Sequence, residues 1–353
     1  MWHGRPAREV LFEMHSWAGR PCHLRRRLQL GDAPASRFWR VIDLEMISRK
    51  YPVDVTRNDN VYMTTHGPPP MQPLAPDRFV IRGPRQGYLS DFTRITHAGL
   101  TGGTDPVETG IEFGIRIQPA NTTWQETSEL ECAWVLLRGA AGLEYDGRRA
   151  SVQRGNVFDE APTALHVSRH TSVVIRSGDV ETEWAVIRTV NTGAFAPRLF
   201  LPSELKPEYR GAGLVQNACL RNVRLIFDRS SRPESNLVVG EVVNYPGRWS
   251  SYPPHHHAQP EIYHYRFTAP TGYGHAELGD EVMKVQHCDT VVIPAGRDHA
   301  QVSAPGYGMY YLWMIRHLPG NPYTGFTFTP EHTWTLDAAQ QGWRPTDLPS
   351  GLA

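Results

Sequence analysis

Short segments of alternating apolar and polar residues recur along most of the chain, usually separated by glycine, proline, asparagine or aspartate. Successive side chains of a β-strand point to opposite faces, so this alternation indicates strands that bury one face. The pattern predicts strands in two groups, namely 112–117, 132–137, 171–175 and 182–187, then 237–243, 261–267, 290–293 and 309–314. Asp146-Gly147 predicts a two-residue hairpin turn within 143–150. We therefore predict an all-β fold.

The two groups of strands are similar in length and predict two tandem β-barrels, an arrangement typical of an internal duplication. The predicted organisation is an atypical or poorly ordered N-terminal extension at 1–75, an N-terminal barrel at 76–195, a connector at 196–236, a C-terminal barrel at 237–340 and a tail at 341–353. The helical signal is weak, with one turn expected at 337–341.

Composition narrows the class of protein. The 353 residues include 31 glycines and 29 prolines, as expected for many turns between short elements. Because 36 basic residues balance 36 acidic ones, the charge favours neither nucleic acid nor an anionic membrane as partner. No apolar run could span a bilayer, and no secretory signal pattern is visible. Four scattered cysteines without a C-x-x-C pair fit a cytoplasmic protein.

A group of histidines in the second barrel is the strongest chemical signal. His255 and His257 are two residues apart, so they share one face of a strand, while His256 faces the other way. A turn should bring Glu261 back beside them, and His299 follows a later strand and turn. Three imidazoles and one carboxylate would bind a divalent metal such as Zn, Fe, Ni, Cu or Mn. They would leave one or two coordination positions open, which is typical of a catalytic site.

Three adjacent histidines alone could equally be a solvated surface patch. Here H-x-H-x3-E is followed by P-x-G-x2-H in a strand and turn context, and both halves rarely agree by chance. This two-part pattern resembles the metal motif of the cupin superfamily. The resemblance implies cupin barrels, and it implies that His255, His257, Glu261 and His299 are the ligands of one metal ion.

Short sequence segments that flank the motif indicate one family within this superfamily. They lie at 239–243, 246–255, 261–267, 270–274, 304–307, 310–312 and 330–334, with looser matches at 197–199 and 210–213. Together they resemble the 5-deoxy-glucuronate isomerase family of myo-inositol catabolism, whose members are bicupins. Two departures lie beside the metal motif. Only residues 258–260 separate the H-x-H from Glu261, and Ala300 stands where the family commonly has proline.

The family resemblance implies a metal-dependent aldose–ketose isomerase that converts 5-deoxy-glucuronate to 5-dehydro-2-deoxy-gluconate. In such a reaction the metal chelates two substrate oxygens while a nearby base moves a proton between adjacent carbons. Because no redox step is needed, we expect zinc, with manganese, iron or nickel as alternatives. A cupin dioxygenase with the same ligands and a non-catalytic sugar-binding bicupin are the competing interpretations.

Side chains near the motif are candidates for the chemical step. Glu261 is one possible base, and Tyr263 and Tyr311 could donate hydrogen bonds to substrate oxygens or simply pack in the barrel core. His264 alternates with its neighbours and should face away from them.

The substrate contacts are expected to come from the same stretch of sequence. Trp249 and Tyr252 are candidate contacts, and Lys284 and Arg297 are candidate cations for the acid group, with a solvated surface position as the alternative. The N-terminal barrel has no H-x-H and is predicted to lack metal ligands. We expect a small sugar acid as the partner and a homo-oligomeric enzyme.

Overall fold

The computed structural model describes residues 13–15, 21–23, 78–89, 91–97 and 107–346. The chain divides into two compact units, 1–70 and 71–353. Within the first, β1 (Glu13–His15) and β2 (Pro21–His23) form an antiparallel pair. Most of the predicted N-terminal extension lies outside the described residues.

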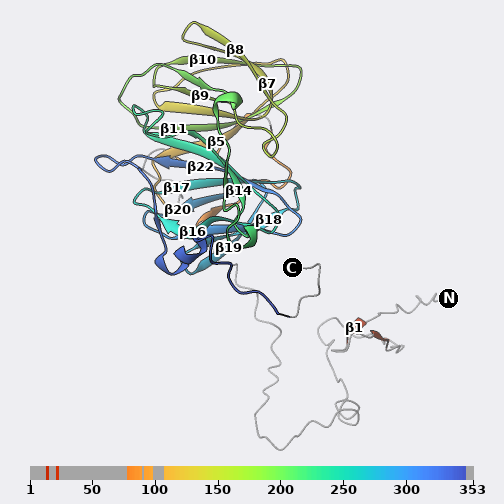
Figure 1. Cartoon of the computed structure of the whole chain (residues 1–353). Coiled ribbons are helices and arrows are strands. Elements are labelled where there is room, and N and C mark those ends of the chain that lie inside the picture. Colours follow the sequence, from red (N-terminus) through yellow and green to blue (C-terminus); the bar gives the residue numbers. More distant parts are fainter. Residues whose placement is uncertain (1–12, 16–20, 24–77, 90, 98–106, 347–353) are drawn as a thin grey trace, which may run out of the picture. The chain divides into compact units, whose positions relative to one another are not determined.

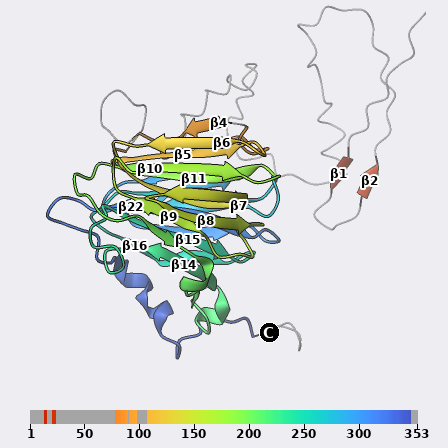
Figure 2. The ribbon, with the colours of Figure 1, turned by 90° about the horizontal axis from the view of Figure 1, so that it is seen from above.

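In the second unit, strands β4 to β12 form a nine-stranded antiparallel sheet. Figures 1 and 2 show its arrangement. Its strands are β4 (Asp91–Arg94), β5 (Ile111–Gln118), β6 (Thr123–Thr127), β7 (Glu131–Tyr145), β8 (Arg148–Arg154), β9 (Ala164–Val167), β10 (Ser172–Ser177), β11 (Thr182–Thr189) and β12 (Arg198–Phe200). Asp146 and Gly147 have positive φ angles of 49° and 71° and connect β7 to β8, so the predicted hairpin turn is confirmed.

Two further antiparallel sheets carry the C-terminal part. The seven-stranded sheet runs in the order β13 (Glu208–Arg210), β14 (Arg221–Phe227), β15 (Leu237–Asn244), β22 (Met309–Arg316), β17 (Glu261–Phe267), β20 (Thr290–Ile293), β3 (Val80–Ile81). The five-stranded sheet runs in the order β19 (Glu281–Gln286), β18 (Tyr273–Leu278), β21 (His299–Ser303), β16 (Trp249–His256), β23 (Thr327–Phe328). The prediction of an all-β fold is confirmed.

Three short 3₁₀ segments complete the described elements: η1 (Pro202–Glu204), η2 (Val215–Asn217) and η3 (Pro330–Leu336). A helical turn was expected at 337–341. The structure instead has η3, which ends at Leu336, just before that range. Pro330 occupies the start of η3, where its missing N–H costs nothing.

Strands cross the boundaries expected from the sequence. β3, from the range assigned to the N-terminal barrel, pairs with β20 of the C-terminal sheet. The range 196–236, expected to be a connector, contributes β12 to the first sheet and both β13 and β14 to the second. The sequence pattern did not predict β14, because buried arginines at 221 and 224 interrupt its apolar residues.

Three clusters of buried side chains explain why many strands are apolar on both faces. One fills the N-terminal barrel, a second fills the C-terminal barrel, and a third lies between the two. Tyr263 and Tyr311 face into the C-terminal barrel, whereas Ile262 and Leu312 belong to the cluster between the barrels. His264 packs on this second face against Phe113, at 5.1 Å between ring centroids, and so lies away from its neighbours as predicted.

A buried group of charges also joins the barrels. The carboxylate of Glu241 on β15 accepts hydrogen bonds from Arg154 (2.7 Å), from Arg224 (2.9 Å) and from the hydroxyl of Tyr310 (3.0 Å). Both guanidinium groups also donate to the carbonyl of Glu160. Because Arg154 ends β8 and Glu241 belongs to β15, this cluster fixes one barrel against the other.

Candidate active site

The two sheets of the C-terminal barrel bring the metal-binding candidates together. His255 and His256 end β16, His257 follows them, and Glu261 begins β17 after a three-residue turn. His299 begins β21 and lies opposite His255 in the β16–β21 pair. The histidines therefore come from the five-stranded sheet and the carboxylate from the seven-stranded one, which places the site inside the barrel.

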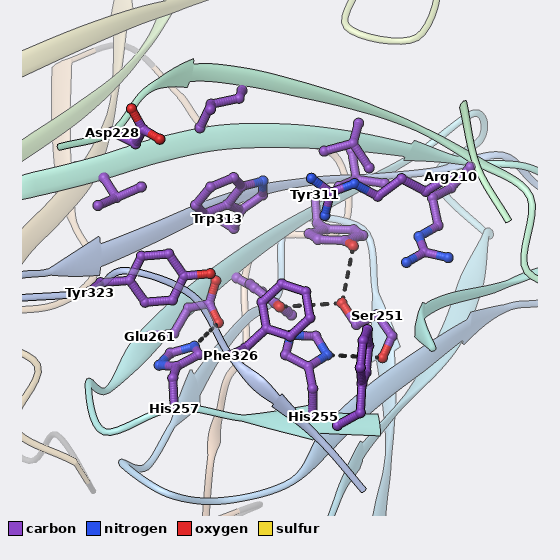
Figure 3. Close-up of a pocket in the computed structure, with 17 residues that line it drawn as sticks. Arg210, Asp228, Ser251, His255, His257, Glu261, Tyr311, Trp313, Tyr323 and Phe326 are labelled. Atoms are coloured by element: carbon purple, nitrogen blue, oxygen red, sulfur yellow. Dashed lines mark hydrogen bonds and ion pairs between the residues drawn. The ribbon is translucent and has the colours of Figure 1, made fainter. Parts of the chain in front are cut away.

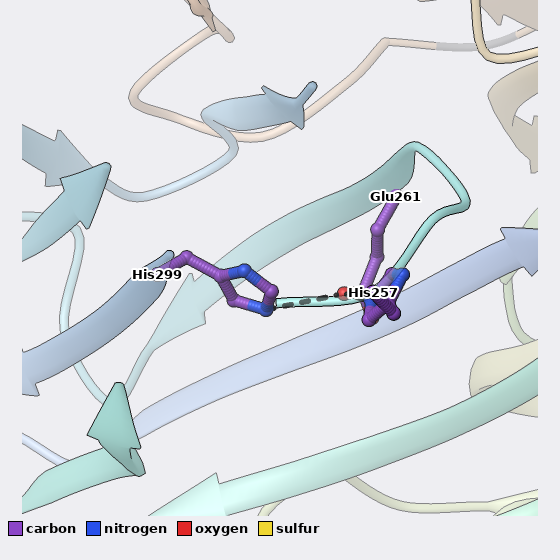
Figure 4. A group of neighbouring side chains, drawn as sticks. All are labelled: His257, Glu261 and His299. Carbon is purple, nitrogen blue, oxygen red and sulfur yellow. Dashed lines mark hydrogen bonds and ion pairs between the residues drawn. The ribbon is translucent and has the colours of Figure 1, made fainter. Parts of the chain in front are cut away.

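Three of the four predicted ligands form a tight buried cluster (Figure 4). Glu261 Oε2 lies 3.1 Å from His257 Nε2 and 3.4 Å from His299 Nε2. One ligand atom of each residue lies within 4.8 Å of the other two. The short turn at 258–260 is thus long enough to place His257 against Glu261.

His255 stands beside this cluster, with its ring centroid 4.4 Å from that of His299. Its Nδ1–H donates to the carbonyl of Ser251 (3.2 Å), so its Nε2 carries the free lone pair. His256, which the strand pattern excluded, forms a 2.7 Å contact with Asp298 instead. The role of His255 as the fourth ligand stays a prediction.

The donor atoms of the cluster fit a divalent metal. His257 Nδ1 and His299 Nε2 are buried without a hydrogen-bond partner among the described residues. Because His299 Nδ1 donates to the carbonyl of Arg297 (3.0 Å), its Nε2 presents a lone pair towards Glu261. Buried polar atoms are normally paired, so a lone pair directed at a carboxylate calls for a cation between them.

The charge states of the cluster also suit metal binding. Burial alone would raise the pKa of the Glu261 carboxyl, but the adjacent imidazoles of His257 and His299 hold that pKa at about 2. Burial, together with the neighbouring His299, lowers the pKa of His255 to about 3. A carboxylate and a neutral imidazole are the forms that bind metals.

A cavity of about 210 Å³ opens beside the cluster (Figure 3). Its polar lining includes Arg210, Arg221, Ser251, Tyr263 and Tyr311. Aromatic side chains of Trp313, Tyr323 and Phe326 cover the remainder. A cavity of this size suits a small metabolite rather than a polymer.

Two buried tyrosines present hydroxyl groups to this cavity. Tyr311 Oη lies 2.7 Å from Ser250 Oγ, and Tyr263 Oη lies 3.4 Å from Ser251 Oγ. Burial raises the pKa of the Tyr311 hydroxyl and raises that of Tyr263 well above its ordinary value. Both hydroxyls therefore keep their protons at neutral pH and can act as hydrogen-bond donors.

The four predicted substrate contacts do not line this cavity. Trp249 and Tyr252 pack against each other, with ring centroids 5.5 Å apart, and Tyr252 lines a neighbouring hollow. The Lys284 ammonium lies 4.3 Å from the ring centroid of Tyr273, and Arg297 pairs with Glu281 at 3.1 Å. The described cavity therefore does not include these side chains, and their role as substrate contacts stays a prediction.

Several other residues that line the cavity were not selected from the sequence. Arg210 and Arg221 come from β13 and β14, in the range expected to be a connector. Tyr323 follows β22, and its ring centroid lies 5.0 Å from that of His257. The looser family match at 210–213 was the one sequence signal that pointed towards this wall.

The N-terminal barrel places its histidines differently. His166 is buried and lies 2.8 Å from Glu131, while its Nδ1 accepts from Arg232 Nε (3.1 Å). Burial, opposed by the bond to Glu131, lowers the pKa of His166. Within the described part of this barrel, no group of three ligand atoms like that of the C-terminal barrel is found.

Comparison with known proteins identifies relatives along most of the chain. Residues 107–335 match the KduI/IolB family. The 5-deoxy-glucuronate isomerase of Geobacillus thermodenitrificans is 30% identical over 291 residues, covering 74% of this chain and 97% of that protein. The 5-deoxy-glucuronate isomerase of Geobacillus kaustophilus is 31% identical over 243 residues, covering 62% of this chain and 82% of that protein.

Solved structures agree with the barrel architecture. An IolB-like protein from Salmonella typhimurium LT2 superposes with a TM-score of 0.58 at 26% identity, covering 64% of this chain and 90% of that one. The structure of a protein named as a putative glyoxylate-induced protein of Pseudomonas aeruginosa superposes with a TM-score of 0.52 at 16% identity. The match covers 72% of this chain and 96% of that one. This second likeness concerns the fold alone. No helix among the described residues is long and apolar enough to cross a membrane.

Proposed function

The chain belongs to the KduI/IolB family, and we propose that it is a metal-dependent aldose–ketose isomerase that converts 5-deoxy-glucuronate to 5-dehydro-2-deoxy-gluconate. Relatives carrying the name of that activity support the choice of substrate. The observation that carries the proposal is the buried cluster of His257, Glu261 and His299 in the wall of a small polar cavity.

His257, Glu261 and His299 would hold one divalent metal ion, with His255 Nε2 as the fourth ligand. Zinc is the preferred ion because the isomerisation transfers no electrons to or from the substrate as a whole. When bound, the ion would act as a Lewis acid on the carbonyl oxygen of the substrate. The hydrogen bond from His299 Nδ1 to the carbonyl of Arg297 leaves Nε2 free and so fixes the imidazole tautomer that such a site requires.

The reaction moves one proton from C2 to C1 of the sugar acid and another from the C2 hydroxyl to the C1 oxygen. Among the described residues that line the cavity, Glu261 and Asp228 carry carboxylates. The Asp228 carboxylate accepts backbone N–H groups of Ser230 and Ser231, which assigns it to a turn. Glu261 remains the candidate proton carrier, and Tyr263 and Tyr311 are the candidate donors to the substrate oxygens.

Replacing Tyr311 with phenylalanine is expected to lower kcat by about 10²-fold, because one hydrogen-bond donor to a developing oxyanion is lost. The ring would keep its packing against Tyr263, at 4.8 Å between centroids. Steady-state kinetics with 5-deoxy-glucuronate, together with metal analysis of the variant, measure the effect. An unchanged kcat with full metal content would remove Tyr311 from the mechanism.

The proposed activity is tested by incubating purified protein with 5-deoxy-glucuronate and following the ketose product. We expect turnover that a chelator abolishes and that added zinc restores. Oxygen uptake, measured in the same samples, should be absent. Metal-replete protein that leaves the sugar acid unconverted would contradict the proposed function, whatever ion it binds.

A further inference from the structure

One wall of the cavity carries a buried cation that has no acidic partner. Arg221 on β14 is 9% exposed and lines the cavity. Its Nη1 donates to the carbonyls of Cys219 (2.9 Å) and Tyr252 (3.5 Å). Among the described residues, no carboxylate lies within ion-pair distance of Arg221. A buried charge without a counter-ion is costly, and truncation of one partner of a buried pair costs a protein several kcal/mol.

The neighbouring strand adds a second positive charge instead of relieving the first. Arg210 lies directly opposite Arg221 in the antiparallel pair of β13 and β14. Like charges at opposed positions destabilise a sheet. Glu208 pairs with Arg210 at 2.8 Å and thereby compensates that guanidinium. Arg221 is left as the uncompensated cation of the wall, and its pKa is lowered mainly by burial, with a smaller lowering by Arg210.

The cavity therefore has two chemically different ends (Figure 3). Glu261 and His257 gather at one end, next to Tyr323, whereas Arg210 lies at the other end beyond Tyr311 and Ser251. The first end offers metal ligands and the second offers guanidinium groups. A ligand that matches both ends carries a reactive carbonyl at one terminus and an anionic group at the other.

We propose that Arg221 is the residue that binds the substrate carboxylate, with Arg210 opposite it as the assisting cation. This inference rests on the proposed function, because it states how that site selects an acid over a neutral sugar. The guanidinium group binds a carboxylate through two parallel N–H donors, and such charge-assisted bonds are the strong ones in a buried site. The carboxylate in turn supplies the counter-charge that the protein does not provide.

The test compares two substrates in wild-type protein and in Arg221→Gln. One substrate is 5-deoxy-glucuronate, and the other is its neutral analogue with CH₂OH in place of the carboxylate. We expect Arg221→Gln to lose about 100-fold in kcat/KM for the acid, mostly through KM, because a partner of a desolvated charge pair is removed. The neutral analogue should react at its wild-type rate, so the preference for the acid disappears.

Two further variants control for folding and for charge in general. Arg221→Met keeps most of the side-chain volume and replaces Arg221→Gln if that variant does not fold. Arg176→Gln, on β10, removes a half-exposed arginine that pairs with Glu144 at 2.7 Å far from the cavity lining, and it should keep the acid preference. Melting temperature and metal content are measured for each variant.

Binding is measured separately with the acid whose aldehyde has been reduced to an alcohol, which cannot isomerise. If wild-type protein binds this probe and Arg221→Gln does not, the inference stands even when no turnover is seen. If wild-type protein turns over the acid while both Arg221 variants keep its preference and its affinity, the inference is overturned and the isomerase proposal survives. If wild-type protein neither binds nor converts the acid, both are overturned.

Discussion

Replacing His299 with alanine is expected to remove the bound metal and to lower turnover on the order of 10³-fold, because Lewis-acid stabilisation is worth several kcal/mol. His299 supplies a buried Nε2 that faces Glu261 and has no hydrogen-bond partner among the described residues. This free Nε2 facing a carboxylate is the arrangement expected of a metal ligand. Metal analysis of the purified variant and kcat for 5-deoxy-glucuronate measure the two effects.

His256 provides the matched control for this experiment. It is a histidine of the same strand, and it pairs with Asp298 outside the ligand cluster. His256→Ala should therefore retain metal and activity. A His299→Ala variant that keeps stoichiometric metal would contradict the proposed ligand set. A His256→Ala variant that loses metal would show that the ligands lie on the face of β16 that carries His256.

Strand periodicity predicted much of this site because the relevant rule is local. A spacing of two residues puts His255 and His257 on one face and His256 on the other, whatever the rest of the fold does. Glu261 could be predicted as well, since it opens the next strand after a short turn. Only three residues separate His257 from Glu261, and this turn places Glu261 Oε2 3.1 Å from His257 Nε2.

The substrate wall could not be predicted in the same way because it is built from distant segments. Arg221 lies more than thirty residues before the metal motif, and only the pairing of β14 with β15 carries it into the barrel. Lys284 on β19 and Arg297 in the turn before β21 are nearer in sequence, but their side chains lie against Tyr273 and Glu281. Periodicity predicts which side chains share one face of a strand. The lining of the cavity also depends on which strands pair with each other, and periodicity does not predict that.

The boundary between the barrels shows the same limit. Arg154, Arg224 and Glu241 are charged residues at positions that an apolar pattern would assign to the surface. In the structure all three are buried between the barrels, where Glu241 pairs with both arginines. A pattern of single residues cannot reveal such compensation, since each charge is tolerated only through partners 17 or 87 positions away.

Replacing Glu241 with glutamine is expected to destabilise the protein by about 3–5 kcal/mol, because breaking a buried ion pair leaves uncompensated charge in the interior. Glutamine keeps the shape of the side chain but removes the counter-charge of both Arg154 and Arg224. Burial alone would lower the pKa of Arg154, and Glu241 raises it in the native protein. Arginine side chains keep their proton in proteins, so both guanidinium groups stay charged in the variant without their counter-charge. Denaturant unfolding gives the free energy, and Tm should fall by roughly 10 °C.

The appropriate comparison is an ion pair of the same chemistry that water screens. Glu181 and Arg138 form such a pair at 3.0 Å, with side chains 45% and 53% exposed. Glu181→Gln should change stability by less than about 1 kcal/mol, because exposed pairs contribute little. If the two variants unfold at the same denaturant concentration, the charge cluster does not hold the barrels together. The apolar cluster between them, with Phe113 and Leu312 among its members, and contacts such as the Arg266–Glu183 ion pair must then do so.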